Sequence, residues 1–315
     1  MSKLIRPLLM SLVLLSACGG AEKGSSGDVD SASNGGQAPV SQDAEADCAA
    51  WLADTPFTGT AALCENDTRM ALGQLAADRP SRISLSSGRD ALVWLPDDWA
   101  RRERQSILVV LHGSVGCQEG IFADARWAFG DTHALVSLSH KTGPGSFLEA
   151  ADLQVDLDEA LDTLAGACPT GDATHLMYGL SRGGLRAIQL AGLDRSGPQR
   201  LAGVVSDSGS ANARAVSGLS YDGARVLLWC GEHDPDPVQE GRTTCEVMSG
   251  ELAPTLESSG ATVDDVLVGE EACHGMFGWD CTADCATCDG RAGPGEVGPH
   301  AARVAAWLAQ VAQGG

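Results

Sequence analysis

Residues 175–184, HLMYGLSRGG, are the most informative stretch of the sequence, because here an apolar run stops abruptly at a serine flanked by glycines. Gly179, Ser181 and Gly183 form a G-x-S-x-G pattern at the expected end of a strand. This pattern predicts a sharp strand-to-helix turn in which glycine avoids collisions and the serine takes a strained backbone conformation. We therefore expect the Ser181 hydroxyl above a helix N-terminus, where free N–H groups and the helix dipole stabilise an oxyanion.

Apolar strand-like runs alternate with helical patterns on both sides of this stretch. The predicted strands are 107–111, 134–138, 175–180, 201–205, 226–229 and 266–268, and the predicted helices are 153–164, 182–193 and 304–311. Two further runs, 83–85 and 91–95, read as an antiparallel hairpin at the sheet edge. The alternation predicts an α/β fold, a mostly parallel twisted sheet of about eight strands flanked by helices, with its site at the strand C-termini.

Three reactive residue types follow three of these strands in a fixed order. Ser181 comes first, Asp234 follows the strand at 226–229, and His274 follows the last strand. A serine hydroxyl is a poor nucleophile at neutral pH, so an imidazole must take its proton and a carboxylate must orient that imidazole. The order serine, acid, histidine therefore predicts a triad with His274 as the base and Asp234 as its orienting acid.

Other residues compete for these roles. Asp207, which follows the strand at 201–205, is an alternative acid, and Asp236 is a third. His233 is expected to be a loop residue and His300 a cap of the final helix. The histidines beside strand-like runs are expected to be structural; they are His133, His140 and His175.

From about residue 83 to the end, the chain resembles the α/β-hydrolase superfamily. Three features carry the resemblance: the G-x-S-x-G-G elbow, the pair His112-Gly113 after an earlier strand, and the pair His274-Gly275 after the last strand. Within it, the chain looks most like secreted polyhydroxybutyrate depolymerases and feruloyl esterases. The resemblance implies cleavage of small or polymeric carboxylic esters through an acyl-serine intermediate, with no metal or organic cofactor. A serine peptidase of the prolyl-oligopeptidase type and a non-catalytic binding module on the same fold remain alternatives.

The resemblance also implies an oxyanion hole. The backbone N–H of Arg182 would form one half, and the loop after Gly113 the other, with Ser114 as the nearest match and Val115 as the fallback. The histidine of the His112-Gly113 pair would be structural. The Arg182 side chain either faces solvent or adds a donor to the hole, as the equivalent arginine does in glucuronoyl esterases.

Only residues 206–224 separate the two strands between which lipases usually insert a lid. This connection is too short for a large helical cap, so we expect an open site. Trp127, Phe277 and Trp279 are candidate wall residues of the substrate pocket, with ordinary core packing as the alternative for each.

The N-terminus predicts export. Lys3 and Arg6 precede a short apolar run, and Leu15-Ser16-Ala17-Cys18 resembles the lipobox of bacterial lipoproteins. The expected organisation is a signal peptide at 1–17, lipidated Cys18 with a disordered linker at 18–47, and a hydrolase domain at 48–315 that has an N-terminal extension at 48–79. We expect a monomer that is lipid-anchored in the cell envelope, at the outer membrane or in the periplasm. Its net charge of −21 disfavours nucleic acid, and its membrane contact runs through the lipid alone.

Ten cysteines follow Cys18, and disulfides are the expected state in an exported chain. Cys48 and Cys64 are spaced to close a short loop. A bridge between Cys230 and Cys273 would tie the acid-bearing loop to the histidine-bearing loop. The C-x-x-x-C-x-x-C spacing near the C-terminus leaves a zinc or iron–sulfur site as a minor alternative; it consists of Cys281, Cys285 and Cys288.

Overall fold

The computed structural model describes residues 42–56, 80–114, 116–193, 200–209, 213–237, 239–270, 272, 274–277, 279–281, 288–291 and 299–314. All of them belong to one compact unit, 40–315. The predicted signal peptide and Cys18 lie outside the described residues. Helix α1 begins at Gln42, so it includes the last residues of the predicted linker. None of the described helices combines the length and the hydropathy needed to span a bilayer.

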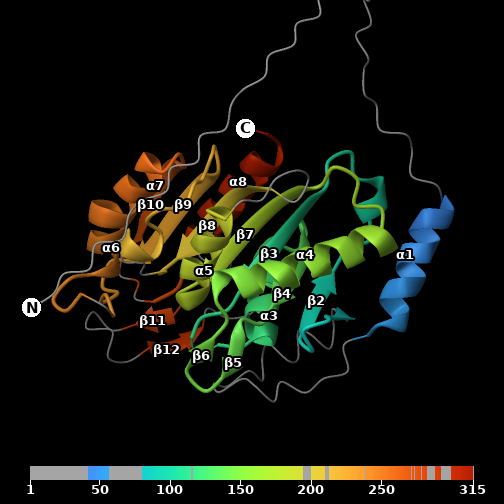
Figure 1. The fold of residues 1–315 in the computed structure, drawn as a ribbon, viewed down its shortest axis with the longest axis horizontal. Helices are drawn as coiled ribbons and strands as arrows, with labels where there is room; N and C mark the ends of the chain where they lie inside the picture. Colours follow the sequence, from blue (N-terminus) through green and yellow to red (C-terminus); the bar gives the residue numbers. More distant parts are fainter. Residues whose placement is uncertain are drawn as a thin grey trace, which may run out of the picture. The chain divides into compact units, whose positions relative to one another are not determined.

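An eight-stranded sheet forms the centre, in the order β1-β2-β4-β3-β7-β8-β9-β10 (Figure 1). Its strands are β1 Ser81–Ser84, β2 Asp90–Trp94, β3 Ser106–Leu111, β4 Ala134–Leu138, β7 Thr174–Leu180, β8 Leu201–Asp207, β9 Arg225–Gly231 and β10 Thr262–Gly269. The neighbours from β4 to β10 run parallel, whereas β1 pairs with β2, and β2 with β4, antiparallel. The mostly parallel sheet and its edge hairpin are therefore as predicted.

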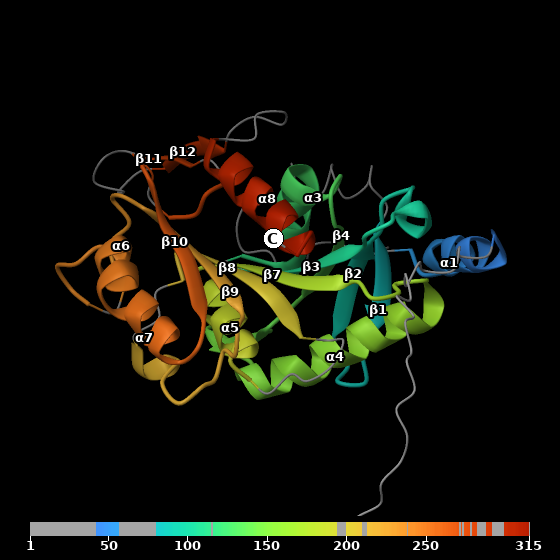
Figure 2. The ribbon, with the colours of Figure 1, turned by 90° about the horizontal axis from the view of Figure 1, so that it is seen from above.

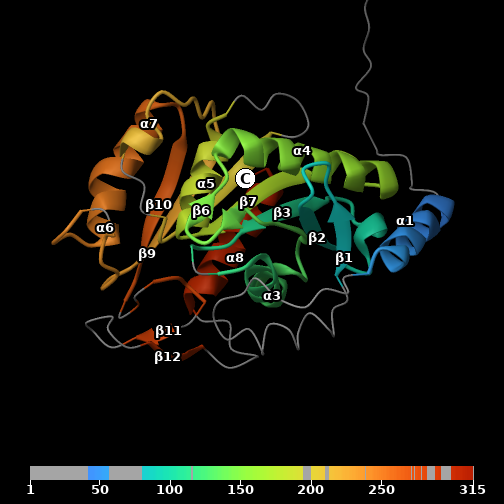
Figure 3. The same ribbon diagram turned by 60° about the horizontal axis from the view of Figure 1, so that its bottom comes forward.

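Helices cover both faces of this sheet (Figure 2). One face carries α4 (Ala150–Ala167) and α5 (Arg182–Ala191), and the other carries α3 (Gln118–Phe129) and α8 (Pro299–Ala312). Figure 3 shows α8 beside α3. The remaining described elements are α1 Gln42–Asp54, η1 Trp99–Arg101, β5 Lys141–Gly143, β6 Ser146–Phe147, η3 Ala213–Ala215, α6 Thr244–Val247, the π-helical turn η4 Met248–Leu252, α7 Ala253–Ser258, β11 Trp279–Cys281 and β12 Cys288–Arg291.

Strand β3 explains why a continuous apolar run suits this position. Alternate side chains of a strand point to opposite faces. Ile107, Val109 and Leu111 pack into the core beneath α4 and α5, while Leu108 and Val110 pack into the core beneath α3 and α8. Each buried side chain of this size stabilises the fold by about 1.5 to 3 kcal/mol, so both faces hold the strand in place.

Helix α4 shows the predicted amphipathic pattern. Its leucines at positions 153, 157, 161 and 164 are buried against the sheet. Helix α1 contacts α4, and this brings Cys48 to Cys168 at the C-terminal end of α4, where the two form a disulfide. The predicted pairing of Cys48 with Cys64 is therefore wrong, because Cys48 faces α4.

Candidate active site

The carboxyl ends of the parallel strands meet at one edge of the sheet, and the predicted site residues follow them there. Ser181 comes directly after β7, Asp234 three residues after β9, and His274 five residues after β10. The loop of Gly113 follows β3 in the same way. Right-handed parallel connections bring these distant parts of the sequence to a common edge.

The turn at Ser181 has the strained geometry that its sequence predicts. Its φ of 53° and ψ of −118° are unusual for a residue with a side chain. A Cβ on Gly183 would lie 2.6 Å from the carbonyl oxygen of His112, and a Cβ on Gly179 would collide with the carbonyl of Gly183. The glycines are therefore required by close backbone approach. The Ser181 N–H also donates to the carbonyl of Asp207 at 2.7 Å, which ties the turn to β8.

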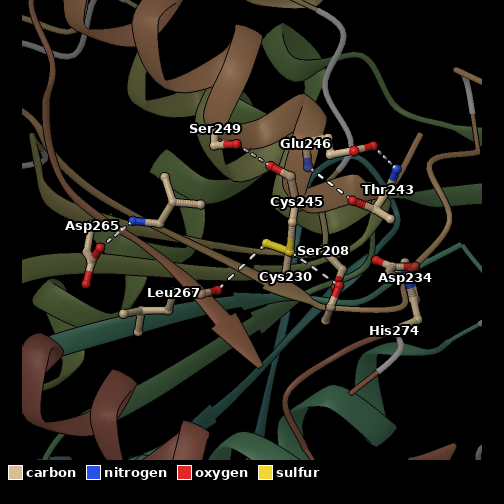
Figure 4. The surroundings of a disulfide bond; sticks show 12 residues. Ser208, Cys230, Asp234, Thr243, Cys245, Glu246, Ser249, Asp265, Leu267 and His274 are labelled. Carbon is tan, nitrogen blue, oxygen red and sulfur yellow. Dashed lines mark hydrogen bonds and ion pairs between the residues drawn. A yellow bond between two sulfur atoms is a disulfide. The ribbon is translucent and has the colours of Figure 1, made fainter. Parts of the chain in front are cut away.

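His274 and Asp234 are brought together (Figure 4). Nδ1 of His274 lies 3.0 Å from Oδ1 and 3.1 Å from Oδ2 of Asp234. The Asp234 side chain is 3% exposed, whereas that of His274 is 44% exposed. Burial opposes protonation of His274, but the hydrogen bond and charge of Asp234 and the charge of Asp207 outweigh it and raise the pKa of the imidazole. With Nδ1 engaged, Nε2 is the nitrogen left to accept a proton.

The histidine loop packs against the residue that precedes the serine. Gly275 has a φ of +93°, and a Cβ at this position would lie 3.1 Å from Cδ1 of Leu180. Its N–H donates to Oγ of Ser208 at 3.2 Å. The residue after His274 therefore lies next to the residue before Ser181, although almost one hundred residues separate them in sequence.

Of the three candidate acids, Asp234 is the one that holds the imidazole. Asp207 is fully buried at the end of β8, and its Oδ2 instead accepts from the Tyr178 hydroxyl at 2.5 Å and from the Met276 N–H at 3.0 Å. Asp236 accepts from the Gln239 N–H within its own loop. Burial raises the pKa of Asp207 to about 6, against the opposing effects of these two hydrogen bonds and of the His274 charge.

The predicted oxyanion loop lies against the serine. A Cβ on Gly113 would lie 3.3 Å from Cβ of Ser181, and the next residue, Ser114, is exposed. Val115 lies outside the described residues. Arg182 occupies the first position of α5, where a backbone N–H has no acceptor within the helix. Its side chain is exposed, and the guanidinium carbon lies 4.9 Å from the centre of the Phe147 ring.

His112 has the structural surroundings that the resemblance implied. It is buried, its Nδ1 lies 2.7 Å from the Gly113 carbonyl oxygen, and its ring stacks on His140 with 4.3 Å between centroids. Burial lowers the pKa of His112 to about 4 and that of His140 to about 2. Both rings are therefore neutral at physiological pH. His133 is also buried, with Nδ1 at 2.7 Å from Oγ of Ser106.

The predicted wall residues fare differently. Phe277 is 7% exposed and packs against Tyr178 and Phe129, which fits the core-packing alternative for this residue. Trp127 is half-buried against the same core. The side chain of Trp279 lies outside the described residues. No three histidine, cysteine or acidic side chains in the described ranges come together as a metal site.

A disulfide closes the loop that carries Asp234 (Figure 4). Cys230 lies at the end of β9 and pairs with Cys245 in α6, so the predicted bridge from Cys230 to Cys273 is wrong. The physical reason is local: α6 starts beside the strand end, since the Thr244 N–H donates to the carbonyl of Asp234 at 2.8 Å. Neither this disulfide nor the role of Ser208 was predicted from the sequence, and the φ of 50° at Ser208 has no recognisable sequence signal.

No protein-family model matches the sequence, and no curated protein sequence matches it significantly. Several solved esterases share its fold. A hyperthermophilic esterase from the archaeon Pyrobaculum calidifontis has a TM-score of 0.54 at 15% identity, over 88% of this chain and 99% of that one. Esterase B from Lactobacillus rhamnosis, inhibited by a tributyrin phosphonate, has a TM-score of 0.56 at 12% identity, over 87% and 97% of the two chains. An arylesterase has a TM-score of 0.51 at 14% identity, over 74% and 83%. The sheet order and these likenesses establish the α/β-hydrolase fold.

Proposed function

We propose that the protein is a serine hydrolase that cleaves carboxylic esters through an acyl-Ser181 intermediate. The observation that carries this proposal is the His274–Asp234 pair at the sheet edge where Ser181 occupies its strained turn. A buried carboxylate on Nδ1 fixes the imidazole tautomer that leaves Nε2 free to act as a base. An inert binding module would have no need for a strained serine and an oriented histidine together.

The reaction follows from these roles. Nε2 of His274 takes the hydroxyl proton while Oγ of Ser181 attacks the carbonyl carbon of the ester. The imidazolium formed next to Asp234 then gives this proton to the leaving alcohol, and the C–O bond of the ester breaks. In the second half, His274 deprotonates a water that attacks the acyl carbon, and the released acid leaves Ser181 with its proton restored.

The negative oxygen of each tetrahedral intermediate is assigned to two donors. The Arg182 N–H at the start of α5 is one, supported by the helix dipole. The other comes from the loop after Gly113, with Ser114 as its described candidate; the contact between Gly113 and Ser181 supports this position. Such donors lower the barrier by about 3 to 4 kcal/mol each in comparable sites.

Ester cleavage is favoured over peptide cleavage. Three neighbours in fold are described as esterases. Between β8 and β9 the described residues contain one short helical turn, η3, which supports an open site accessible to small or polymeric esters. A prolyl-oligopeptidase-like peptidase is the second candidate, because it uses the same G-x-S-x-G-G elbow.

A fluorophosphonate probe tests the nucleophile. The purified wild type should be labelled once, on Ser181, and Ser181→Ala should not be labelled. A series of para-nitrophenyl esters measured beside peptide anilides then distinguishes an esterase from a peptidase. Labelling that persists in Ser181→Ala would exclude this mechanism.

We also infer that Cys18 anchors this hydrolase to the bacterial cell envelope. The lipobox-like Leu15-Ser16-Ala17-Cys18 supports it. Mass spectrometry of the mature N-terminus should find an acylated cysteine, and Cys18→Ser should release the protein from the membrane fraction. An unmodified Cys18 would leave ordinary secretion as the better account.

A further inference from the structure

A second acid lies in the site, and the proposed reaction does not use it. Asp207 is completely buried between β7 and β9, so its carboxylate is shielded from water. Burying a carboxylate costs free energy unless hydrogen bonds and nearby positive charge offset the lost hydration. One of its oxygens, Oδ2, accepts hydrogen bonds from both the Tyr178 hydroxyl and the Met276 N–H.

The next residue, Ser208, also forms a hydrogen bond with the loop that follows His274. Its φ of 50° is strained for a residue with a side chain, and its N–H donates to the Trp229 carbonyl at 2.8 Å. In this conformation Oγ of Ser208 accepts the N–H of Gly275. The two consecutive N–H groups after His274, those of Gly275 and Met276, are thus both held by the two consecutive residues at the end of β8.

The same two residues also hold the nucleophile and the acid strand. The carbonyl of Asp207 accepts the N–H of Ser181, and Ser208 is bonded to the end of β9, from which the Asp234 loop departs. The end of β8 therefore contacts the three segments that carry Ser181, Asp234 and His274. Figure 4 shows Ser208 close to the His274–Asp234 pair.

We propose that Asp207, assisted by Tyr178 and Ser208, is a positioning residue that fixes the backbone after His274 and thereby sets the reach of the imidazole toward Ser181. This inference rests on the proposed function. A displacement of a catalytic group by about 1 Å can cost roughly a hundredfold in rate. Without the carboxylate, the Met276 N–H loses its acceptor, and of the two N–H groups that follow His274 only that of Gly275 is still held by the end of β8.

Asp207 also acts on His274 through its charge. The charged and titratable groups around it are Tyr178 from β7, His274 from the loop and, next to that imidazole, Asp234; Asp124 acts on Tyr178 from α3. The negative charge of Asp207 contributes to the raised pKa of His274. A substitution that removes the charge of Asp207 but keeps its hydrogen bonds should therefore move the acid limb of kcat/KM to lower pH.

Two variants separate position from charge. Asp207→Ala should lower kcat, and the rate of fluorophosphonate labelling at pH 8, by about a hundredfold, with KM changed less than about threefold. Asp207→Asn keeps an oxygen for both donors, so it should retain most of the activity while its acid limb in kcat/KM shifts to lower pH. Ser206→Ala is the matched control, since Ser206 is one residue earlier on β8 and equally buried, and its hydroxyl makes no hydrogen bond with the described residues of the histidine loop. This variant should behave as wild type.

A purely structural role for Asp207 predicts other results. If folded Asp207→Ala is labelled at the wild-type rate, the positioning role is wrong. An acid limb that stays in place in Asp207→Asn would exclude the effect of the Asp207 charge on His274. Should Asp207→Ala fail to fold by near-ultraviolet circular dichroism, Ser208→Ala serves as the second variant, with an expected loss in kcat of roughly tenfold for one buried hydrogen bond; full activity in that variant would overturn the proposal.

Failure of the proposed function would be seen separately. If Ser181 of the wild type is not labelled at all, the hydrolase assignment fails. Amide hydrogen exchange at Met276 still tests the positioning role in that case, because it needs no activity. The Met276 N–H should exchange faster in Asp207→Ala than in the wild type or in Ser206→Ala, and equal rates would contradict the proposal.

Discussion

At the scale of single residues, Ser181 and Ser208 show the free-energy cost of the backbone conformations in this site. Each has a positive φ that glycine would adopt without strain, and such a conformation costs about 1 to 3 kcal/mol. Each also has a hydroxyl group that glycine lacks: that of Ser181 is the proposed nucleophile, and that of Ser208 accepts a hydrogen bond. The conformation of Ser181 belongs to the N-cap position of α5, and that of Ser208 lets its hydroxyl oxygen accept the N–H of Gly275.

The Asp234–His274 pair gives a pH prediction. Because Asp234 raises the pKa of His274 above 6.5, the wild type should lose activity as the pH falls through a value above 6.5, where the imidazole becomes protonated and can no longer act as a base. Asp234→Asn removes both the charge and the correct tautomer, so kcat should fall by about 10⁴-fold.

The acid limb of the residual activity in Asp234→Asn should move to lower pH, because the main group that raises the His274 pKa is gone. Steady-state kcat/KM between pH 5 and 9 measures both effects. Asp236→Asn is the control in the same loop and should keep the wild-type profile. An acid limb that stays in place in Asp234→Asn would show that another group controls the histidine.

At the scale of elements, the loop between β9 and α6 determines where the acid lies. The Cys230–Cys245 disulfide closes it over 15 residues, and Pro235 pairs with Thr243 inside it. Arg242 forms an ion pair with Glu251 on η4 at its far end. The disulfide holds the two ends of the loop and the Arg242–Glu251 ion pair holds its far end, which restricts the movement of Asp234.

Removing this disulfide should lower both stability and activity. Cys230→Ala with Cys245→Ala releases a 15-residue loop, a loss of about 3 kcal/mol by the chain-entropy relation. Asp234 then moves relative to His274, so kcat should fall at least tenfold. Urea unfolding and steady-state kinetics of the double variant measure the two effects.

The other disulfide is the matched control. Cys48→Ala with Cys168→Ala opens a separation of 120 residues, so its loss of stability should be larger, about 5 kcal/mol. It ties α1 to the end of α4, away from the strand ends, and kcat should be unchanged at a temperature where the protein stays folded. Equal kcat losses in both double variants would mean that lowered stability, and no specific positioning, explains the effect.

Elements that obey one strong local rule were predicted correctly. The strand β3 is apolar on both faces, α4 has leucines at helical spacing, and the turn at Ser181 is dictated by its glycines. The elements from α6 to α7 were missed, because a π-helical turn interrupts their periodicity. Helix α3 was missed too; its first turn begins with Gln118 and contains a glycine.

The candidate site also contains features that the sequence predicted and features that it did not. Chain order alone indicated Ser181, Asp234 and His274, because each follows a recognisable strand. The disulfide partners and the contacts of Asp207 could not be predicted, since they depend on which loops meet across the sheet edge. The sequence left two readings for Phe277, because an aromatic residue near the histidine has the same sequence signal whether it lines a pocket or fills the core.

At the scale of the whole molecule, the buried titratable groups should control stability in acid. Burial lowers the pKa of His112 and His133 to about 4 and that of His140 to about 2, from 6.5. As the pH falls below 6.5, the unfolded chain binds three protons that the folded protein does not bind. Their contribution to stability is therefore lost as the pH falls from about 6.5 toward 4.

Asp207 acts in the opposite direction. Its folded-state pKa of about 6 exceeds its usual 3.8, so the folded protein binds that proton first and gains stability as the pH falls between these values. Near pH 5 the three histidines outweigh Asp207, so the unfolded state binds more protons than the folded state and the free energy of unfolding should fall as the pH falls. Urea unfolding at pH 7, 6 and 5 measures how the free energy of unfolding changes with pH.

His140→Phe keeps an aromatic ring against His112 and removes one titrating group, so it should reduce the slope of the free energy of unfolding against pH by about 1.4 kcal/mol per pH unit. An unchanged slope in that variant would mean that the His140 ring is protonated in the folded state and that its burial does not oppose the charge.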